Sequence, residues 1–485
     1  MKKRTKQFFL YRHRLGIGYV LLAFIFFALL SFLPTVAPGG ISQGEMESTI
    51  VSSELNRNFV AEGDIINTPY HIIQKASLHF LGLNLFAIKL PSIIIAVMAG
   101  FFIILLLNRW FKNDVAIIGS ILTTLSTAFL FLAGNGTALI MYVFWLALIL
   151  WLGSKIVGNS RVHPLLVISF FLCLALSAYT PHLLYVAIAI AIAGIMHPHL
   201  RFALKQLTFW QLILSFGIFT LAISPLVIGC VLKPENVQTL LFMPKFSIGA
   251  LVSNISNAFA PFFSFSLVYD SIFLAPLFGL ATVVLVIIGI LASIGKMYTS
   301  RNTVVSLLAI YAILISGLNG DVAVCIIIPI AILSAAGVDS IIEKWYSLFP
   351  ENPYAHLFGI VPLVVVLTMI IGSGLSHFIF GYHYAPRVAN NFNNDLTIIT
   401  DNISKETPLL ITDDTKNGDF YKLLDKYEDY IIIDHSSDVA EYAAFSARKD
   451  EGFTLKQIIT SPKSRNSDRL YIYSKVTEQE EKGEK

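Results

Sequence analysis

Two glutamates, Glu45 and Glu47, follow the first long apolar stretch of the chain, in the sequence GGISQGEMESTIVSSELNRNF (39–59). Paired carboxylates can carry out general acid–base chemistry when they face one cavity. Residues 45–59 contain no Gly or Pro, so they can form a surface helix. At about 100° per residue the two acids lie roughly 200° apart on such a helix. At most one of them can therefore face inward.

The face of this predicted helix that carries Glu45 also carries Thr49 and Ser52, whereas Glu47 shares its face with Glu54. A glutamate at such a position can also serve only as a solvated side chain, or as a first-turn acid that the helix dipole favours. The spacing by itself does not choose between these roles and a catalytic one.

The elements around these acids are apolar. The chain has 485 residues, of which 55% are hydrophobic and 13% are charged, and its mean hydropathy is +0.71. A soluble protein carries about 25% charged residues. The apolar residues form blocks of about 17 to 25, the length that crosses a bilayer. The composition predicts a polytopic α-helical membrane protein, and the net charge of +3 gives no indication of a nucleic-acid partner.

Eleven apolar blocks are candidate transmembrane helices. They centre near residues 25, 98, 124, 145, 171, 188, 220, 282, 310, 329 and 367. The first block is too long for a signal peptide and no cleavage site follows it, so we expect a retained span. If all eleven cross, six basic segments fall on one side, which predicts a cytoplasmic N-terminus in a multi-pass plasma membrane protein. The long loops 37–88 and 233–270 and the C-terminal tail then lie outside.

The composition changes at about residue 381, so we expect a membrane domain over 1–380 and a small extracytoplasmic α/β domain over 381–475. PLLITDD, YEDYIIIDH and DRLYIYSK predict strands, whereas GDFYKLLDKY, DVAEYAAFSAR and FTLKQII predict helices. Residues 476–485 (VTEQEEKGEK) predict a disordered tail.

Several kinds of chemistry lack their motifs in this sequence. There is no Walker loop, no HExxH and no His/Cys cluster with ligand spacing. Three separate cysteines, Cys173, Cys230 and Cys325, lie within apolar blocks and are expected to pack there. A transporter or flippase of lipid-linked saccharide stays an alternative, although the spans lack the charged path and the matched broken helices typical of transporters.

An ordered set of motifs over residues 37–153 resembles the GT-C superfamily of membrane glycosyltransferases, in particular the protein O-mannosyltransferase and aminoarabinose transferase types. The set comprises SQGEMEST after the first span, NTPYHIIQKASLHFLGLN, AIKLPSIIIAVMAG and LLLNRWFKNDVAIIGSILTTLSTAFLF. Each motif is weakly specific, and their order carries the resemblance.

The resemblance implies an extracytoplasmic enzyme of the cell envelope, such as one of protein glycosylation, that transfers a sugar from a polyprenyl-phosphate-linked donor to an acceptor hydroxyl. The acceptor would be a protein, a lipid-linked saccharide or an envelope glycan. A first-loop acid would be the general base, and we favour Glu45 over Glu47. Cationic or polar donors would stabilise the leaving phosphate. The candidates are Arg57, Lys75, Lys89, Arg387, His71 and His182.

These donors also have structural interpretations: Lys89 as a snorkelling lysine, Arg387 as an interface anchor and His182 as a turn residue. The chain departs from the family pattern in three places. Gly44-Glu45 replaces an Asp-Glu pair, GNGTALIMYVFW lacks the second acid expected after the third span, and Lys89 replaces an arginine. The departures keep a catalytically silent membrane scaffold as a further alternative. Too few acids cluster to predict a cofactor metal, although some members of the family use a divalent ion.

Overall fold

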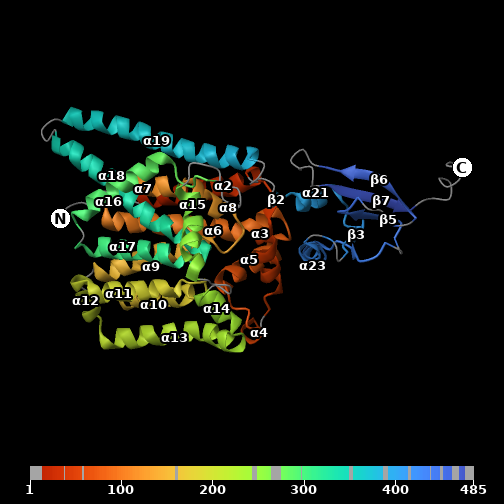
Figure 1. Ribbon diagram of the computed structural model, residues 1–485, viewed down its shortest axis with the longest axis horizontal. Helices are drawn as coiled ribbons and strands as arrows, with labels where there is room; N and C mark the ends of the chain where they lie inside the picture. Colours follow the sequence, from red (N-terminus) through yellow and green to blue (C-terminus); the bar gives the residue numbers. More distant parts are fainter. Residues whose placement is uncertain are drawn as a thin grey trace, which may run out of the picture.

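The computed structural model describes residues 14–475 except 38, 57–58, 159–161, 243–247, 264–274, 297, 349–352, 386–390, 413–414, 416, 437–438, 448–449, 451 and 461–468. A large helical bundle occupies one part of the molecule, and a smaller sheet domain is attached at one end of it (Figure 1).

The bundle consists of the apolar helices expected from the sequence. They are α2 (Arg14–Val36), α6 (Leu85–Trp110), α7 (Asn113–Thr124), α8 (Thr127–Gly134), α9 (Ile140–Val157), α10 (Pro164–Ser177), α11 (Leu184–Met196), α12 (Pro198–Lys205), α13 (Phe209–Leu232), α16 (Leu280–Ile294), α17 (Ser300–Ile315), the 3₁₀ segment η2 (Gly320–Ile326), α18 (Ile327–Leu348) and α19 (Pro353–Tyr384). Helices α19 and α13 lie on opposite outer edges of the bundle (Figure 1).

In the described part of the chain, five helices are long and apolar enough to cross a membrane, or up to seven if each of two bent pairs is one span. The bent pairs are α7 with α8, at 59°, and α11 with α12, at 98°. Shorter apolar helices cover Ala23–Pro34, Pro164–Ser177, Leu280–Ile294 and Ser300–Ile315. A multi-pass helical membrane protein is thus confirmed, whereas the number eleven stays a prediction.

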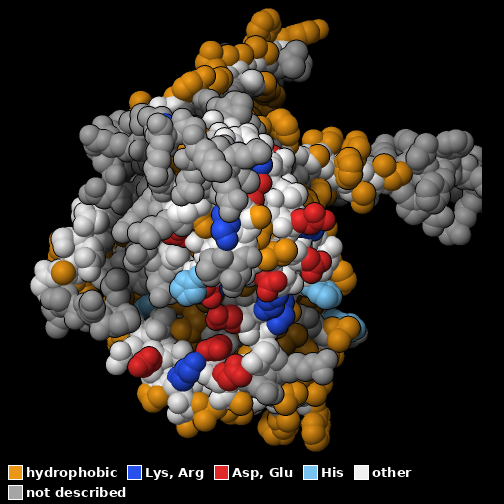
Figure 2. Space-filling model, turned by 90° about the vertical axis from the view of Figure 1, so that its right-hand side faces the viewer, with side chains coloured by type: hydrophobic (Ala, Val, Ile, Leu, Met, Phe, Trp, Pro, Cys, Tyr) orange, Lys and Arg blue, Asp and Glu red, His pale blue; other side chains and the backbone are white. Residues whose placement is uncertain are grey.

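The first long loop folds over one end of the bundle. It contains β1 (Ile41–Ser42), α3 (Gln43–Glu54), α4 (Phe59–Glu62) and α5 (Thr68–Leu81). Between α13 and α16 lie α14 (Glu235–Leu241), η1 (Ile248–Ala250) and α15 (Leu251–Phe263). On the face that the C-terminal domain and this end of the bundle present together, acidic, basic and histidine side chains are spread among uncharged ones, and hydrophobic side chains project around its margin (Figure 2). Helix α12 lies at the opposite end (Figure 1).

The C-terminal domain contains β2 (Phe392–Asn393), α21 (Asp395–Asn402), β3 (Leu409–Leu410), α22 (Gly418–Tyr421), α23 (Leu423–Glu428), β4 (Ile432–Ile433), β5 (Glu441–Ala444), β6 (Phe453–Ile459) and β7 (Leu470–Lys475). Its five-stranded sheet has the order β4-β3-β5-β7-β6. Strand β3 is parallel to both neighbours, and the other two pairs are antiparallel.

Two secondary-structure predictions in this domain are wrong. The segments DVAEYAAFSAR and FTLKQII were expected to be helical, but they contain β5 and β6. Both strands pair with β7, at Tyr442 with Tyr473 and at Phe453 with Lys475. Pairing with a strand distant in sequence decides whether such short segments are helical or extended. The local hydrophobic periodicity carries no information about that partner strand. The predicted strands in PLLITDD, YEDYIIIDH and DRLYIYSK are present as β3, β4 and β7.

The two parts of the molecule share a core. β1 pairs antiparallel with β2, at Ile41 with Asn393 and at Ser42 with Phe392. One buried apolar cluster combines Met46 and Leu78 of the first loop with Leu396 and Leu424 of the C-terminal domain. A Cβ atom added to Gly40 would lie 2.7 Å from the carbonyl oxygen of Asn393, so glycine allows the two strands to approach. The first loop is thereby fixed between the bundle and the sheet domain.

Candidate functional site

Helix α3 begins with a capping box, which positions Glu45. The Ser42 hydroxyl accepts a hydrogen bond from the Glu45 amide at 3.3 Å, and the Glu45 Oε2 accepts one from the Ser42 amide at 2.7 Å. Such a Ser-x-x-Glu pattern satisfies amides at a helix start that have no partner within the helix. The spacing is visible in the sequence as Ser42-Gln43-Gly44-Glu45, and it could have predicted that Glu45 turns back toward the start of the helix.

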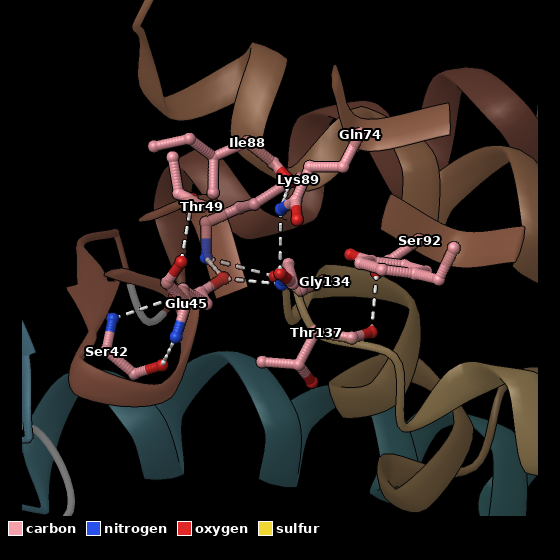
Figure 3. A network of polar contacts seen from close by, with 11 residues as sticks. Ser42, Glu45, Thr49, Gln74, Ile88, Lys89, Ser92, Gly134 and Thr137 are labelled. Carbon is pink, nitrogen blue, oxygen red and sulfur yellow. Dashed lines mark hydrogen bonds and ion pairs between the residues drawn. The ribbon is translucent and has the colours of Figure 1, made fainter. Parts of the chain in front are cut away.

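The second carboxylate oxygen of Glu45 forms a buried ion pair. Oε1 lies 2.6 Å from the Lys89 ammonium nitrogen and also accepts from the Gly136 amide at 2.6 Å. Lys89 donates in addition to the Gly134 carbonyl at 3.0 Å (Figure 3). The side chains of Lys89 and Glu45 are 2% and 0% exposed. Three segments distant in sequence, α3, α6 and the loop after α8, therefore meet at one carboxylate.

A polar network extends from this pair along α3 and α5. The Gln74 Oε1 accepts from Ser48 at 2.8 Å and from Ser52 at 2.6 Å, and its amide nitrogen donates to the carbonyl oxygens of Ile88 and Gly136. Gln74 and Glu45 thus both bind Gly136, one at its carbonyl and the other at its amide.

His71 is joined to the same network. Its Nδ1 lies 2.7 Å from the Ser52 hydroxyl, and burial lowers the pKa of this histidine from 6.5 to about 4. Glu45, Thr49 and Ser52 are all buried, whereas Glu47 is exposed and accepts a hydrogen bond from the Gln43 amide at 3.0 Å. The prediction that the two glutamates lie on opposite faces of one helix is confirmed, and Glu45 is the one that faces inward.

The expected phosphate donors are not gathered in one place. Lys89 has a buried ammonium, whose hydrogen bonds go to the Glu45 carboxylate and the Gly134 carbonyl and not to the membrane interface. Lys75 is half-buried and donates to the Leu55 carbonyl at the end of α3. Arg57 and Arg387 lie outside the described residues.

His182 occupies a separate position, in the turn between α10 and α11. It has a left-handed backbone (φ 64°), and its amide donates to Leu240 at 2.7 Å while its carbonyl accepts from the Tyr311 hydroxyl. Within the described chain neither ring nitrogen has a partner, and burial lowers the pKa of the imidazole to about 4. No described hydrogen bond connects the His182 side chain to the network around Glu45.

The arrangement has a clear chemical consequence. A carboxylate can take a proton only where one of its oxygens is accessible, and the side chain of Glu45 is fully buried. A base role for Glu45 therefore needs the residues packed around its carboxylate to move first. No group of three His, Cys, Asp or Glu side chains in the described residues could hold a metal ion.

Comparison with known proteins gives a likeness in structure only. No family model matches the chain, and no curated protein does. Two solved structures of ArnT from Cupriavidus metallidurans have similar folds. The one bound to undecaprenyl phosphate has a TM-score of 0.50 and covers 95% of this chain and 98% of its own, and the apo form has a TM-score of 0.51 and covers 94% and 98%. Identity is 10% in both cases.

A third structure, the Archaeoglobus fulgidus oligosaccharyltransferase tethered with an acceptor peptide, has a TM-score of 0.44 at 10% identity, over 76% of this chain and 55% of that one. At such identities a likeness defines the fold alone. The two ArnT structures therefore show that this chain has the fold of ArnT over nearly its whole length.

Proposed function

We propose that the protein is an integral membrane glycosyltransferase that transfers a sugar from a polyprenyl-phosphate-linked donor to an extracytoplasmic acceptor. The acceptor would be a protein, a lipid-linked saccharide or an envelope glycan. The observation that carries the proposal is the match of nearly the whole chain to nearly the whole of ArnT, one structure of which is bound to undecaprenyl phosphate. A lipid-linked donor also accounts for the membrane setting, because its chain stays in the bilayer while its phosphate reaches the polar end.

The proposed topology has eleven spans, a cytoplasmic N-terminus and an extracytoplasmic C-terminal domain in the plasma membrane. The five long helices, the two bent pairs and the four shorter apolar helices occur at the positions of the eleven blocks in the sequence. The first loop and the sheet domain lie together at one end of the bundle, as this topology requires (Figure 1).

In the proposed mechanism, Lys89 changes its partner. A donor phosphate competes with Glu45 for the Lys89 ammonium, since both are anionic acceptors of charge-assisted hydrogen bonds. The Glu45 oxygen that is released then takes the proton of the acceptor hydroxyl as this hydroxyl attacks the anomeric carbon. The bond from that carbon to the phosphate oxygen breaks, and the phosphate leaves with Lys89 as its counter-ion. Because the pair is buried, α3 or the loop at Gly134–Gly136 must move when substrate binds.

The test is sugar transfer from labelled polyprenyl-phosphate donors in membranes that contain the wild-type protein, Glu45→Gln or Glu47→Gln. Loss of a general base lowers the rate by about 10²- to 10⁴-fold, so we expect that loss for Glu45→Gln. Glu47→Gln is the matched control on the opposite face of α3 and should keep wild-type activity. Equal activity in all three proteins would remove Glu45 from catalysis. Thermal unfolding of each variant separates a catalytic loss from a folding loss.

A catalytically silent membrane scaffold is the second candidate, and one observation favours it. The Glu45 carboxylate is fully buried and is paired with Lys89, as in a residue that only fixes structure. If the wild-type protein transfers no sugar from any polyprenyl-phosphate donor, while Glu45→Gln still lowers its stability, the scaffold role replaces the enzymatic one.

A further inference from the structure

A cavity of about 400 Å³ lies at the end of the bundle opposite to Glu45. It is lined by the last turn of α6, by α9, α10, α11 and α12 and by the start of α17. Lys89 and Arg109 are 20 positions apart on α6, which separates the two sites by about 30 Å at 1.5 Å per residue. The cavity is therefore distinct from the network around Glu45. Its size lies within the roughly 300–1,000 Å³ of ordinary ligand pockets.

The walls of the cavity are mostly apolar, and its charged residues are cationic. Leu150, Phe170 and Leu204 are typical of the lining, while Arg109, Arg301 and His199 supply the cations and the imidazole. Arg109 and His199 are exposed, so the cavity reaches the surface of the molecule. An apolar cavity with guanidinium groups at its margin matches a ligand that has an anionic head and a hydrocarbon chain.

Arg109 and Arg301 come from the ends of two helices, and both line the cavity. Arg301 donates to the Trp110 carbonyl at 3.4 Å and lies 4.7 Å from the centre of the Phe111 ring. Arg109 directly precedes Trp110 and packs against Gly158, where an added Cβ atom would lie 1.9 Å from a guanidinium nitrogen. Among the described residues no carboxylate forms an ion pair with either arginine. Arg301 also lines a second pocket together with Asp339 and Glu343, but every charged side chain in the lining of the cavity itself is cationic, so the cavity offers an anion site at this margin.

Helix α12 places this margin at the surface of a membrane. It follows α11 at an angle of 98° and carries exposed Phe202 and Leu204 as well as exposed Arg201 and Lys205. A short helix of this composition lies in the plane of the interface, with its apolar side chains in the acyl region and its basic ones at the head groups. Lipid head groups are thus the anions available at this depth.

We propose that this cavity binds an anionic phospholipid, with its phosphate on Arg109 and Arg301 and one acyl chain between α9, α10 and α12. The apolar walls of the cavity favour the acyl chain of such a lipid, and its cationic margin favours the phosphate. A soluble anion would leave the apolar walls exposed to water, and a neutral lipid would bring no anion to the cationic margin.

The proposal is tested by titrating the delipidated full-length protein in detergent with phosphatidylglycerol and counting bound lipids by native mass spectrometry. Removal of one charge-assisted hydrogen bond should weaken binding about tenfold, so we expect that loss for Arg109→Gln and for Arg301→Gln. Phosphatidylcholine with the same chains should bind about tenfold more weakly than phosphatidylglycerol to the wild-type protein, with no such difference in the double variant.

Gly153→Leu tests the chain-binding part. A Cβ atom at Gly153 would meet Phe170 at 3.5 Å, an ordinary contact, so the rest of the leucine enters the cavity and should displace the acyl chain. Lys205→Gln is the control, because Lys205 is a basic residue of the same interface that does not line the cavity. The proposal is overturned if Lys205→Gln weakens binding as much as Arg109→Gln, if a folded Gly153→Leu binds as the wild type does, or if undecaprenyl phosphate binds there in preference to phosphatidylglycerol.

Discussion

At the scale of single residues, the Glu45–Lys89 pair is the feature with the largest energetic consequence. Both charges are removed from water, and each is matched by the other and by backbone groups at Gly134 and Gly136. A buried pair adds little net stability, but loss of one partner leaves an uncompensated charge and costs about 3–5 kcal/mol. The pair therefore fixes one arrangement of α3 against α6.

Lys89→Met should destabilise the protein by about 3–5 kcal/mol, because it leaves the Glu45 carboxylate buried without a cation. The midpoint of thermal unfolding in detergent measures the loss, and Glu47→Gln is the control, with a change within about 0.5 kcal/mol. In Lys89→Met/Glu45→Gln the second change should restore part of the stability, because it removes the unpaired charge. A Lys89→Met variant as stable as the wild type would show that Lys89 and Glu45 do not form this buried ion pair in the membrane.

His71 predicts a dependence of stability on pH. Burial lowers its pKa from 6.5 to about 4 in the folded protein, so between these values the unfolded chain binds more protons. Its contribution to the free energy of unfolding is full above pH 6.5 and is lost as the pH falls toward 4. His71→Asn should therefore flatten the decline of the unfolding midpoint over this window. His79→Asn, at an exposed position of the same helix, should leave the curve of the wild-type protein unchanged. Identical curves for His71→Asn and His79→Asn would contradict the assignment of this pH dependence to His71.

At the scale of elements, small residues allow the helices to approach closely. A Cβ atom added to Gly289 of α16 would lie 1.9 Å from the Leu333 carbonyl oxygen, and one added to Gly337 of α18 would lie 2.2 Å from that of Leu285. Glycines at such positions bring backbones together and so favour helix packing within membranes. The close approach of α16 and α18 therefore requires both Gly289 and Gly337.

Gly289→Ala should force α16 and α18 apart and lower stability by about 1–3 kcal/mol, as overpacking does. Gly217→Ala is the matched control, because nothing lies within 4 Å of a Cβ atom at that position of α13. Both changes replace glycine by alanine within an apolar helix, so they share the gain in helix propensity. Equal unfolding midpoints for the two variants would mean that the close approach of α16 and α18 is absent.

At the scale of the whole molecule, the C-terminal domain is bound to the first loop by specific polar contacts as well as by the shared core. Lys426 donates to the Ser53 carbonyl at 2.7 Å, and the Glu428 carboxylate accepts from the Leu83 amide at 3.1 Å. Glu428 also approaches Gly82, whose positive φ and lack of a Cβ atom provide the space. The sheet domain thus holds α3 and the turn after α5 over the end of the bundle.

Replacing Lys426 and Glu428 together by alanine should loosen the domain, since hydrogen bonds to charged groups contribute about 1.5–3 kcal/mol each. We expect the Leu83 amide to exchange its hydrogen faster, because Glu428 is the acceptor that protects it. Lys456→Ala is the control, since its ion pair with Glu441 lies within the sheet domain. Unchanged exchange at Leu83 in the double variant would show that the apolar core alone holds the domain.

The sequence by itself determined the class of the molecule, the positions of its apolar helices and the placement of Glu45 and Glu47 on opposite faces of α3, whereas the structure decided that Glu45 faces inward. What the sequence determined follows from hydropathy and helical periodicity, which are local properties of the chain. Local properties could not decide whether 438–448 and 453–459 form helices or strands, because β7 is their distant partner. They also did not show where Lys89 points, since its acceptors lie 44 and 45 positions away. Only the tertiary structure places Lys89 against Glu45 and two arginines around an apolar cavity, because such meetings depend on how helices distant in sequence pack together.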